Sequence, residues 1–150
     1  MHVSQPSLKG RALRLLSGRE HSRTELERKL GPHEQQPGQL RRVLDELQAK
    51  GFISEQRVVE SVLHRRAAKL GAGRIRQELQ EKGIDDGLVA QAVQQLRATE
   101  LDRAREVWRR RFGSPPQDAG ERARQSRFLA ARGFGGDVIR RVLAGGDSES

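Results

Sequence analysis

The sequence predicts an all-α protein built from three tandem three-helix, helix-turn-helix-like repeats that form an elongated curved array. Three observations favour this fold class. The 150-residue chain contains an internal repeat, which is typical of arrays of small helical units. Its apolar residues recur with helical spacing, and no segment alternates apolar and polar residues as a half-buried strand would. Aromatic residues are scarce, with four Phe, one Trp and no Tyr, which argues against a β-rich fold.

The repeat consists of a helix end, a glycine and a second helix. From Leu79 the chain reads L-Q-E-K-G-I-D-D-G-L-V-A-Q-A-V, and from Leu129 it reads L-A-A-R-G-F-G-G-D-V-I-R-R-V-L. The two copies align without a gap, so Gly83 and Gly133 occupy equivalent positions just past a helix. A glycine there is expected to take the left-handed conformation and fold the next residue back onto the helix end.

The first repeat is predicted to span residues 1–53. Ser22, with Glu25 three residues on, forms a capping box that starts its second helix. Gly51 follows a basic last turn and ends its third helix. The first helix has an apolar stripe at residues 8–16 and is expected to stop at Gly18. The second helix is expected to end at Leu30, before Gly31-Pro32 and a polar loop at 31–38. The third helix has an apolar stripe at residues 40–47.

The second repeat is predicted to span residues 54–98. Ser54 is expected to cap a long helix that runs as far as Leu70, and Gly71 and Gly73 are expected to break it. The next helix closes at Gly83. Asp85 is expected to cap the third helix, whose apolar face is formed by residues 88, 89, 92, 93 and 96.

The third repeat is predicted to span residues 99–144. Its first helix begins near Thr99, carries Phe112 and stops at the Gly-Ser-Pro-Pro run that follows. Asp118 is expected to cap the second helix, and Gly136 or Asp137 starts the third. Residues 145–150 are rich in Gly, Asp, Ser and Glu, and this composition predicts a disordered tail.

The chain is strongly basic. Its 29 Lys and Arg against 20 Asp and Glu give a net charge of +9 and a pI near 11.2. Such a charge favours binding to polyanions or to acidic protein surfaces. The excess is spread along the whole chain, so a generally basic, solvated surface explains it equally well.

Composition also predicts the compartment. Cysteine is absent, which excludes disulfides and thiolate metal sites. No apolar run approaches the length of about 20 residues that crosses a bilayer, and the N-terminus has no apolar signal core. We therefore expect a cytoplasmic protein with no membrane partner, and we expect a monomer.

The sequence shows no constellation of catalytic side chains. The four His are scattered and lack the spacing of metal-binding motifs. Asp85 and Asp86 stand at a helix start, where carboxylates serve as cap and dipole partners. Gly71 and Gly73 resemble a phosphate loop only in composition, because no strand precedes them and no Gly-Lys-Ser/Thr follows. We predict that the protein is not an enzyme and uses no cofactor or metal.

Basic clusters on the second and third repeats are the candidate binding residues. They have two interpretations: a solvated face whose cations favour helix C-termini, or a basic concave stripe that contacts phosphates or acidic side chains. Arg105 and Arg109 share one helix face, and the cluster around them surrounds Trp108. The candidates are Arg65, Arg66, Lys69, Arg74, Arg76, Arg105, Arg109, Arg110 and Arg111.

A helix-turn-helix DNA-binding transcriptional regulator is the alternative function. Short helices joined by glycine turns fit that motif. The helix in the recognition position of the second repeat, residues 88–96, offers Gln91, Gln94 and Gln95 but no arginine before Arg97. Sequence-specific reading of DNA by this helix is therefore disfavoured.

Two segments between residues 50 and 84 resemble a known family. Residues 50–55 read K-G-F-I-S-E, and residues 65–84 read R-R-A-A-K-L-G-A-G-R-I-R-Q-E-L-Q-E-K-G-I. This stretch resembles the central repeat of the RecX family, regulators of the RecA recombinase, with Ser54 in place of the usual acidic residue. The flanking repeats also fit, through Glu25-Leu26 before it and Arg132-Gly133-Phe134 after it, so the resemblance covers about residues 10–144.

The resemblance implies a function and a partner. A RecX-like protein would bind in the groove of the RecA filament on single-stranded DNA, with the option of direct nucleic-acid contact. It would suppress ATP hydrolysis and strand exchange, and so modulate DNA recombination, repair and the SOS response. Residues on the second and third repeats would supply the contacts.

Overall fold

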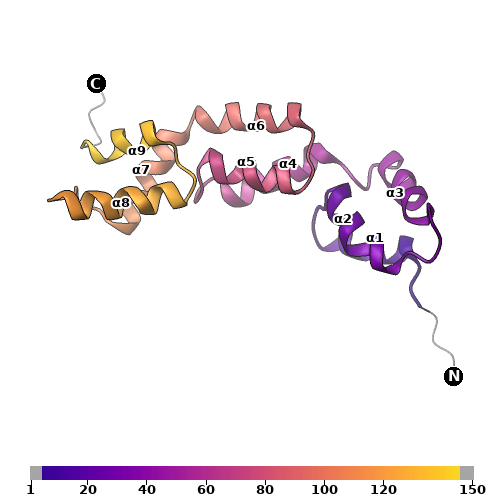
Figure 1. Cartoon of the computed structure of the whole chain (residues 1–150). Coiled ribbons are helices and arrows are strands. Elements are labelled where there is room, and N and C mark those ends of the chain that lie inside the picture. Colours follow the sequence, from indigo (N-terminus) through magenta and orange to yellow (C-terminus); the bar gives the residue numbers. More distant parts are fainter. Residues whose placement is uncertain (1–4, 146–150) are drawn as a thin grey trace.

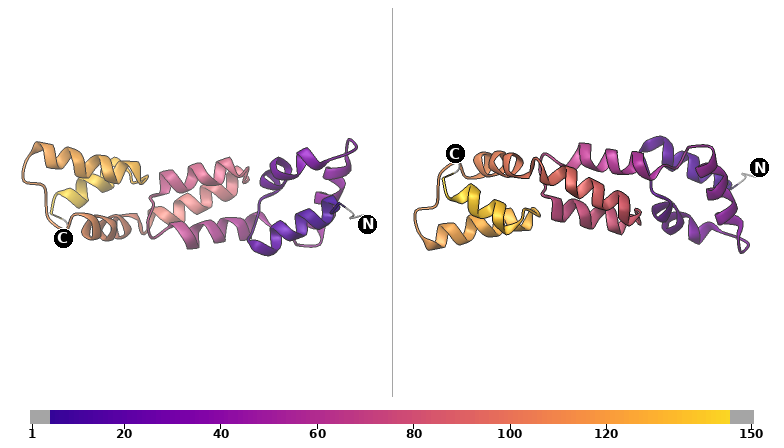
Figure 2. Two further views of the ribbon diagram at one scale, coloured as in Figure 1. Left: turned by 90° about the horizontal axis from the view of Figure 1, so that it is seen from below. Right: turned by 90° about the horizontal axis from the view of Figure 1, so that it is seen from above.

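The computed structural model describes residues 5–145, and within them it contains nine α helices, one short 3-10 helix and no strand. The helices form three successive groups of three that lie in an elongated row, with the first and last groups at opposite ends (Figure 1). The row stays elongated in the two further views of Figure 2. The predicted all-α fold of three tandem three-helix units is confirmed. No helix of the described part is long and apolar enough to span a membrane.

The first unit comprises α1 (Leu8–Gly18), α2 (Arg23–Leu30) and α3 (Gln39–Ala49), with the 3-10 helix η1 (Gly31–His33) after α2. The predicted capping box is present: Ser22 Oγ accepts from the Glu25 backbone N–H, and the Glu25 carboxylate accepts from the Ser22 N–H. The predicted helix ends at residues 18 and 30 are confirmed. The loop after α2 begins with η1, a turn that its polar composition did not reveal.

The second unit comprises α4 (Glu55–Arg66), α5 (Ala72–Glu81) and α6 (Asp86–Arg97). Ser54 and Asp85 cap α4 and α6 as predicted. The expectation that α4 runs as far as Leu70 is wrong, and Gly73 lies inside α5 instead of breaking a helix. The cause lies in the next unit, because the Leu70 carbonyl accepts a hydrogen bond from Arg103 and the Gly71 N–H donates to the Arg132 carbonyl.

The third unit comprises α7 (Glu100–Arg111), α8 (Ala119–Ala131) and α9 (Gly136–Leu143). Asp118 caps α8 as predicted, and Gly136, one of the two predicted starts, begins α9. Phe112 is the residue that ends α7, with its N–H donating to the Trp108 carbonyl. The predicted tail lies, apart from its first residue, outside the described residues. The exact repeat bounds 1–53, 54–98 and 99–144 stay a prediction.

The repeated glycines adopt the predicted conformation. Gly83 and Gly133 have φ angles of 73° and 94°. The residue after each folds back, so that the Ile84 N–H donates to the Leu79 carbonyl at 3.1 Å and the Phe134 N–H donates to the Leu129 carbonyl at 3.2 Å. Both side chains are buried. Only a residue that tolerates positive φ allows this turn, which sets the direction of α6 and α9.

Each unit has its own apolar core. Leu26, Leu44 and Leu47 lie fully buried in the first unit, Ile75 and Leu79 in the second. In the third unit Leu129 and Phe134 are packed with the apolar face of α9. The three clusters share no residue, so each unit has a core of its own.

Candidate functional site

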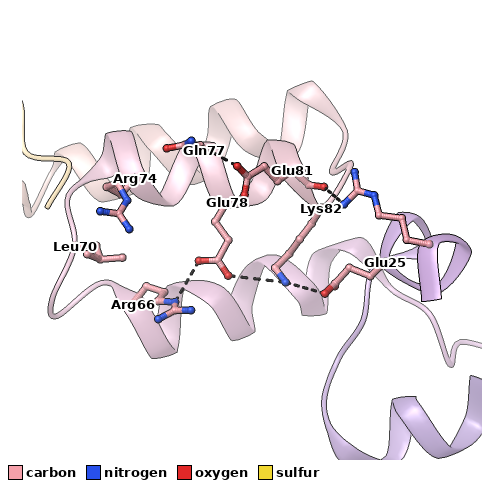
Figure 3. Close-up of a pocket in the computed structure, with 9 residues that line it drawn as sticks. Glu25, Arg66, Leu70, Arg74, Gln77, Glu78, Glu81 and Lys82 are labelled. Carbon is pink, nitrogen blue, oxygen red and sulfur yellow. Dashed lines mark hydrogen bonds and ion pairs between the residues drawn. The ribbon is translucent and has the colours of Figure 1, made fainter. Parts of the chain in front are cut away.

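A polar cleft opens where the first unit meets the second (Figure 3). Its volume is about 720 Å³, and side chains of α2, α5 and the end of α4 enclose it. We call it the interunit cleft. It is lined by Glu25, Arg28, Arg66, Leu70, Arg74, Gln77, Glu78, Glu81 and Lys82.

Glu25 links the two units at one end of the cleft. Its position in the capping box of α2 fixes the carboxylate, since one oxygen accepts from the Ser22 N–H at 2.9 Å. The other oxygen accepts from Arg19 at 2.8 Å and from Lys82, the C-cap residue of α5, at 3.0 Å. Both Glu25 and Lys82 side chains are largely buried. A residue that the sequence marks as a helix cap therefore also joins two units.

The environment of Glu25 keeps its carboxylate ionised. Burial raises its pKa, but hydrogen bonds from Arg19, the Ser22 backbone and Lys82 outweigh burial and lower the pKa to about 2. A carboxylate held in this way is a structural anion at neutral pH and not a proton donor or acceptor. Its role in the cleft is to hold Lys82 in place.

Glu78 lies at the centre of the cleft and gathers cations from two helices. Its carboxylate contacts Arg66 at 3.2 Å, and Arg65 and Lys82 at 3.9 Å each. In Figure 3 the side chains of Arg66 and Glu78 face one another across the space between α4 and α5. Because Glu25 and Glu81 also line the cleft, its four lining cations exceed its three carboxylates by one.

Arg28 and Arg74 add positive charge that no described carboxylate neutralises. Arg28 donates to the carbonyl of Glu81 at 2.9 Å, and Arg74 donates to the carbonyl of Ala131 at 2.7 Å. Each guanidinium has five N–H donors and uses one in these contacts. These hydrogen bonds fix the positions of the two side chains. The remaining N–H donors of both guanidinium groups are available to a carboxylate or a phosphate that enters the cleft.

The structure distributes the nine predicted binding residues over several surfaces. Arg66 and Arg74 line the interunit cleft. Arg65 does not line it but contacts Glu78, which does. Lys69 is exposed in the turn after α4, whereas Arg76 lines a different groove beside α6. The other four, Arg105, Arg109, Arg110 and Arg111, lie on α7 in the third unit.

The arginines of α7 have different surroundings. Arg109 and Arg110 both bind the Glu106 carboxylate, and hydrogen bonds from Arg109 are the main reason that the pKa of Glu106 is lowered. Arg111 lies over the rings of Phe112 and Phe128, with centroid distances of 5.5 and 5.3 Å. A second groove, of about 420 Å³, lies beside Trp108.

Sequence reasoning missed two cations of the cleft, Arg28 and Lys82. Lys82 belongs to the repeated motif and was assigned only to a helix end. No sequence signal links Lys82 to Glu25, because their contact depends on how the units are placed. Across the described residues, no three metal-binding side chains converge.

Three family models match the chain in order. The model described as "RecX, first three-helix domain" matches residues 9–47, the second three-helix domain matches 54–93, and the third matches 98–143. Together the three models account for most of the chain.

Curated relatives and solved structures agree with this match. A "Regulatory protein RecX" of Leptothrix cholodnii is 59% identical over 97% of this chain and 92% of its own length. One of the same name from Ralstonia nicotianae is 47% identical over 95% and 89%. The crystal structure of RecX from Lactobacillus salivarius has a TM-score of 0.73 at 20% identity, covering 91% of this chain and 92% of its own. Another RecX crystal structure has a TM-score of 0.75 at 20% identity, covering 91% of this chain and 71% of its own.

Proposed function

The chain belongs to the RecX family of regulatory proteins, and on that premise we propose that it binds the RecA filament on single-stranded DNA and inhibits RecA. It acts without catalysing a reaction and without a cofactor. By suppressing ATP hydrolysis and strand exchange it modulates recombination, DNA repair and the SOS response in the cytoplasm.

The observation that carries this proposal is the complete, ordered set of three units. An elongated row of three units extends over a longer stretch of a filament than a single unit would (Figure 1). Such a protein restrains the motions of neighbouring RecA subunits and occupies the space that a second DNA would need. It acts as a monomer, one molecule along each stretch of groove.

The interunit cleft is the proposed contact for anionic groups of the filament. Arg28 and Arg74 carry donors that no described carboxylate occupies, and Arg66 is about half exposed. Guanidinium groups bind carboxylates and phosphates through paired hydrogen bonds. The contact is therefore either with acidic side chains of RecA or with the DNA backbone. Binding through the cleft that persists without DNA indicates acidic side chains, and binding that requires DNA indicates the DNA backbone.

The deciding experiment measures ATP hydrolysis by the matched RecA on circular single-stranded DNA while this protein is titrated. We expect inhibition at less than one molecule per RecA, because one molecule spans several subunits. Full hydrolysis at equimolar protein would contradict the proposal. Sequence-selective, salt-dependent binding to duplex DNA without RecA would instead favour a helix-turn-helix transcriptional regulator.

A pair of matched variants tests the cleft. Arg66→Gln with Arg74→Gln removes two cleft charges, and Arg122→Gln with Arg124→Gln removes two exposed charges of α8. We expect the cleft variant to need at least about tenfold more protein for half inhibition, since the loss of a single charge-assisted hydrogen bond costs about 1.5 kcal/mol or more and the variant removes two cations. The α8 variant should inhibit as the wild type does. Circular dichroism of both variants establishes that the fold is retained.

A further inference from the structure

A groove of the first unit lies between α1 and the end of α2. Its volume is about 370 Å³, and we call it the α1 groove. Its lining, taken from the described residues, contains Arg11, Arg14, Lys29 and His33 and no carboxylate. The interunit cleft, by contrast, has four cations against three carboxylates. The α1 groove therefore has the larger excess of positive charge.

The carboxylates of the first unit are all engaged away from the α1 groove. Residues 5–53 contain six of them. Glu34 accepts from the Leu40 N–H at 2.9 Å. The other five form ion pairs with cations outside the groove, and they are Glu20, Glu25, Glu27, Asp45 and Glu46. Within the described part of the chain, the groove cations are thus left without an acidic partner.

Two of these cations project from the middle of α1. Arg11 and Arg14 are three residues apart, so they lie on one face of the helix. Cations often gather in the last turn of a helix because they complement its dipole, but neither arginine lies in that turn. Arg11 donates to the Gln5 side chain over a long 3.4 Å. The stability of α1 therefore does not explain why two arginines stand here.

A buried histidine positions the third cation. The Lys29 ammonium only donates, so His21 Nε2 must accept from it, at 3.1 Å, and His21 Nδ1–H donates to the Arg19 carbonyl at 3.1 Å. Burial lowers the pKa of His21, so its ring is neutral at neutral pH and takes no charge from Lys29. Lys29 is exposed and keeps two N–H donors for a ligand.

The positive end of α1 adds to the charge of the groove. Ser7, the N-cap of this 11-residue helix, and Gly10 in its first turn also line the groove. The first turn contains no acidic residue that would offset the helix dipole. An anion in the groove therefore meets the partial positive charge of the helix end as well as the three cations.

The lining favours a phosphate backbone over an acidic protein segment. The cores of protein interfaces are apolar and rich in aromatic residues, whereas nucleic-acid backbones are bound by Arg, Lys and hydroxyl groups. The described lining has no Phe, Tyr, Trp or Met, and its two leucines, Leu15 and Leu30, are half-buried and buried. It also has no Asn or Gln that would pair with a base. Successive phosphates of one strand supply several negative charges at once.

We infer that the α1 groove binds the phosphate backbone of a nucleic-acid strand, independently of base sequence. Arg11, Arg14 and Lys29 contact the phosphates. The groove lies on the first unit, whereas the binding residues predicted from the sequence lie on the second and third units. It is also separate from the interunit cleft and does not require RecA.

The test measures binding of a labelled oligothymidine of about 15 nucleotides to the full chain without RecA, by fluorescence anisotropy from about 0.05 to about 0.2 M NaCl. Arg11→Gln with Arg14→Gln removes two groove cations. We expect its affinity to fall by about tenfold or more at about 0.1 M NaCl. Its salt slope should fall by about 1.4, because each lost phosphate contact with a single strand accounts for about 0.7. An oligocytidine of the same length should bind the wild type within about threefold.

Matched variants separate the groove from the general charge of the protein. Arg41→Gln with Arg42→Gln removes two exposed arginines of α3 that do not line the groove, and we expect less than about threefold loss and an unchanged slope. Arg11→Lys with Arg14→Lys keeps the charge and should keep the slope. Circular dichroism checks the fold of each variant. Lys29→Gln, which should lower the slope by about 0.7, carries the test if the double groove variant is unfolded.

Four results would overturn the inference. The first is no saturable binding of the oligothymidine by the wild type. The second is an equal loss in the groove and α3 variants, which would make the groove a solvated face. The third is an unchanged salt slope in folded groove variants. The fourth is displacement of the probe by polyglutamate of equal charge at a lower concentration than by unlabelled oligothymidine, which would make the groove a site for an acidic protein. Because RecA is absent from this assay, each of these failures leaves the proposed inhibition of RecA to its own test.

Discussion

The two joints of the molecule are built from different kinds of groups. We call the contact between the first and second units the first joint, and the contact between the second and third units the second joint. Charged side chains span the first joint: Lys82 binds Glu25, and Arg57 binds Glu20 at 2.9 Å. At the second joint, backbone groups of one unit bond directly to backbone groups of the other.

The second joint brings the start of α5 against the end of α8. The Gly71 N–H donates to the Arg132 carbonyl at 2.7 Å, and the Gly73 N–H donates to the Gly133 carbonyl at 3.1 Å. A Cβ on Gly71 would lie 2.5 Å from the Phe134 nitrogen, which explains why the backbone can approach only at a glycine.

A buried carboxylate completes the second joint. Glu100 is 5% exposed and accepts from the Ala72 N–H at 3.1 Å and from the Gly135 N–H at 3.2 Å. It thereby satisfies backbone donors at the starts of α5 and α9, one in each unit.

The difference shows how each orientation is determined. Backbone hydrogen bonds have fixed geometry, so the second and third units are expected to behave as one rigid body. Long charged side chains adapt and respond to pH and salt, so the first unit is expected to move against that body. The predictions below, in order of decreasing effect, test this contrast.

Gly133→Val should have the largest effect. At φ 94° a β-branched residue is strained, and its Cβ would lie 2.5 Å from the Arg74 backbone nitrogen. We expect a loss of about 3 kcal/mol or more in the free energy of unfolding, from strain and overpacking together. Urea denaturation measures it. Gly18→Ala, whose Cβ meets nothing within 4 Å, is the control, and an equal result for both would refute the tight contact.

Gly83→Val tests the equivalent turn at the first joint. Its φ is 73°, and the added Cβ would clash with the side chain of Thr24 instead of with backbone. We expect a loss of about 1–3 kcal/mol. Thr24→Ala should restore part of this loss, because a side chain can be removed, and no single replacement should restore Gly133→Val. Thermal unfolding of the single and double variants checks both statements.

Glu100→Gln tests the buried carboxylate. An amide places an NH₂ group against one of the two backbone N–H donors, so one donor is left unsatisfied. The expected loss is about 1–3 kcal/mol. Glu60→Gln on the exposed face of α4 is the matched control and should change stability little. If the two variants unfold alike, Glu100 does not hold the second joint.

Acid should loosen the first joint before the second. The folded-state pKa of Glu25, about 2, lies below its ordinary value of 4.5, so its contribution is complete above about pH 4.5 and is lost as the pH falls toward 2. Because the sequence has no cysteine, pairs of cysteines can be introduced and spin-labelled. The distance distribution between Arg42→Cys and Gln91→Cys should broaden in this window, and that between Gln91→Cys and Arg127→Cys should not.

Glu25→Gln is the control for this acid response. It should broaden the first distance distribution at neutral pH and remove most of its pH dependence. Glu46 also has a pKa of about 2, but its partners Lys9 and Lys50 lie in the same unit, so its titration does not cross the joint. Equal broadening of both label pairs would show that the two joints respond alike.

A rise in salt concentration should have the smallest effect on the joints. Raising NaCl from about 0.1 to about 1 M shortens the screening length from about 10 to about 3 Å. The exposed Arg57–Glu20 pair should weaken by less than about 1 kcal/mol, and the largely buried Lys82–Glu25 pair by less still. The same spin-label pairs measure it, and a salt response confined to the pair across the second joint would reverse the assignment.

Local features were predictable from sequence. The capping box at Ser22, the caps at Ser54 and Asp118 and the left-handed glycines Gly83 and Gly133 all depend on residues within one turn of each other. The repeat added the number of units and their order. These signals are short-range, so the amino acids alone contain them.

The ends of elements that contact another unit were not predictable in the same way. The stop of α4 at Arg66 depends on Arg103, whose side chain donates to the Ala67 and Leu70 carbonyls from the third unit. The grouping of Arg66 and Arg74 with Arg28 depends on the angle between units. The sequence pattern contains neither the angle between units nor the residue of another unit that makes each contact. The nine predicted binding residues could therefore be named from the sequence but not assigned to their separate surfaces.

The separate cores have a consequence for how the protein is made. The buried cluster of the first unit extends from Leu8 to Ile53 and uses no residue beyond it. As the chain leaves the ribosome, this unit can complete its core while the third is still unsynthesised. The second joint closes last, because Gly71 must wait for Arg132 to emerge. The first joint therefore forms before the second joint as the chain is synthesised.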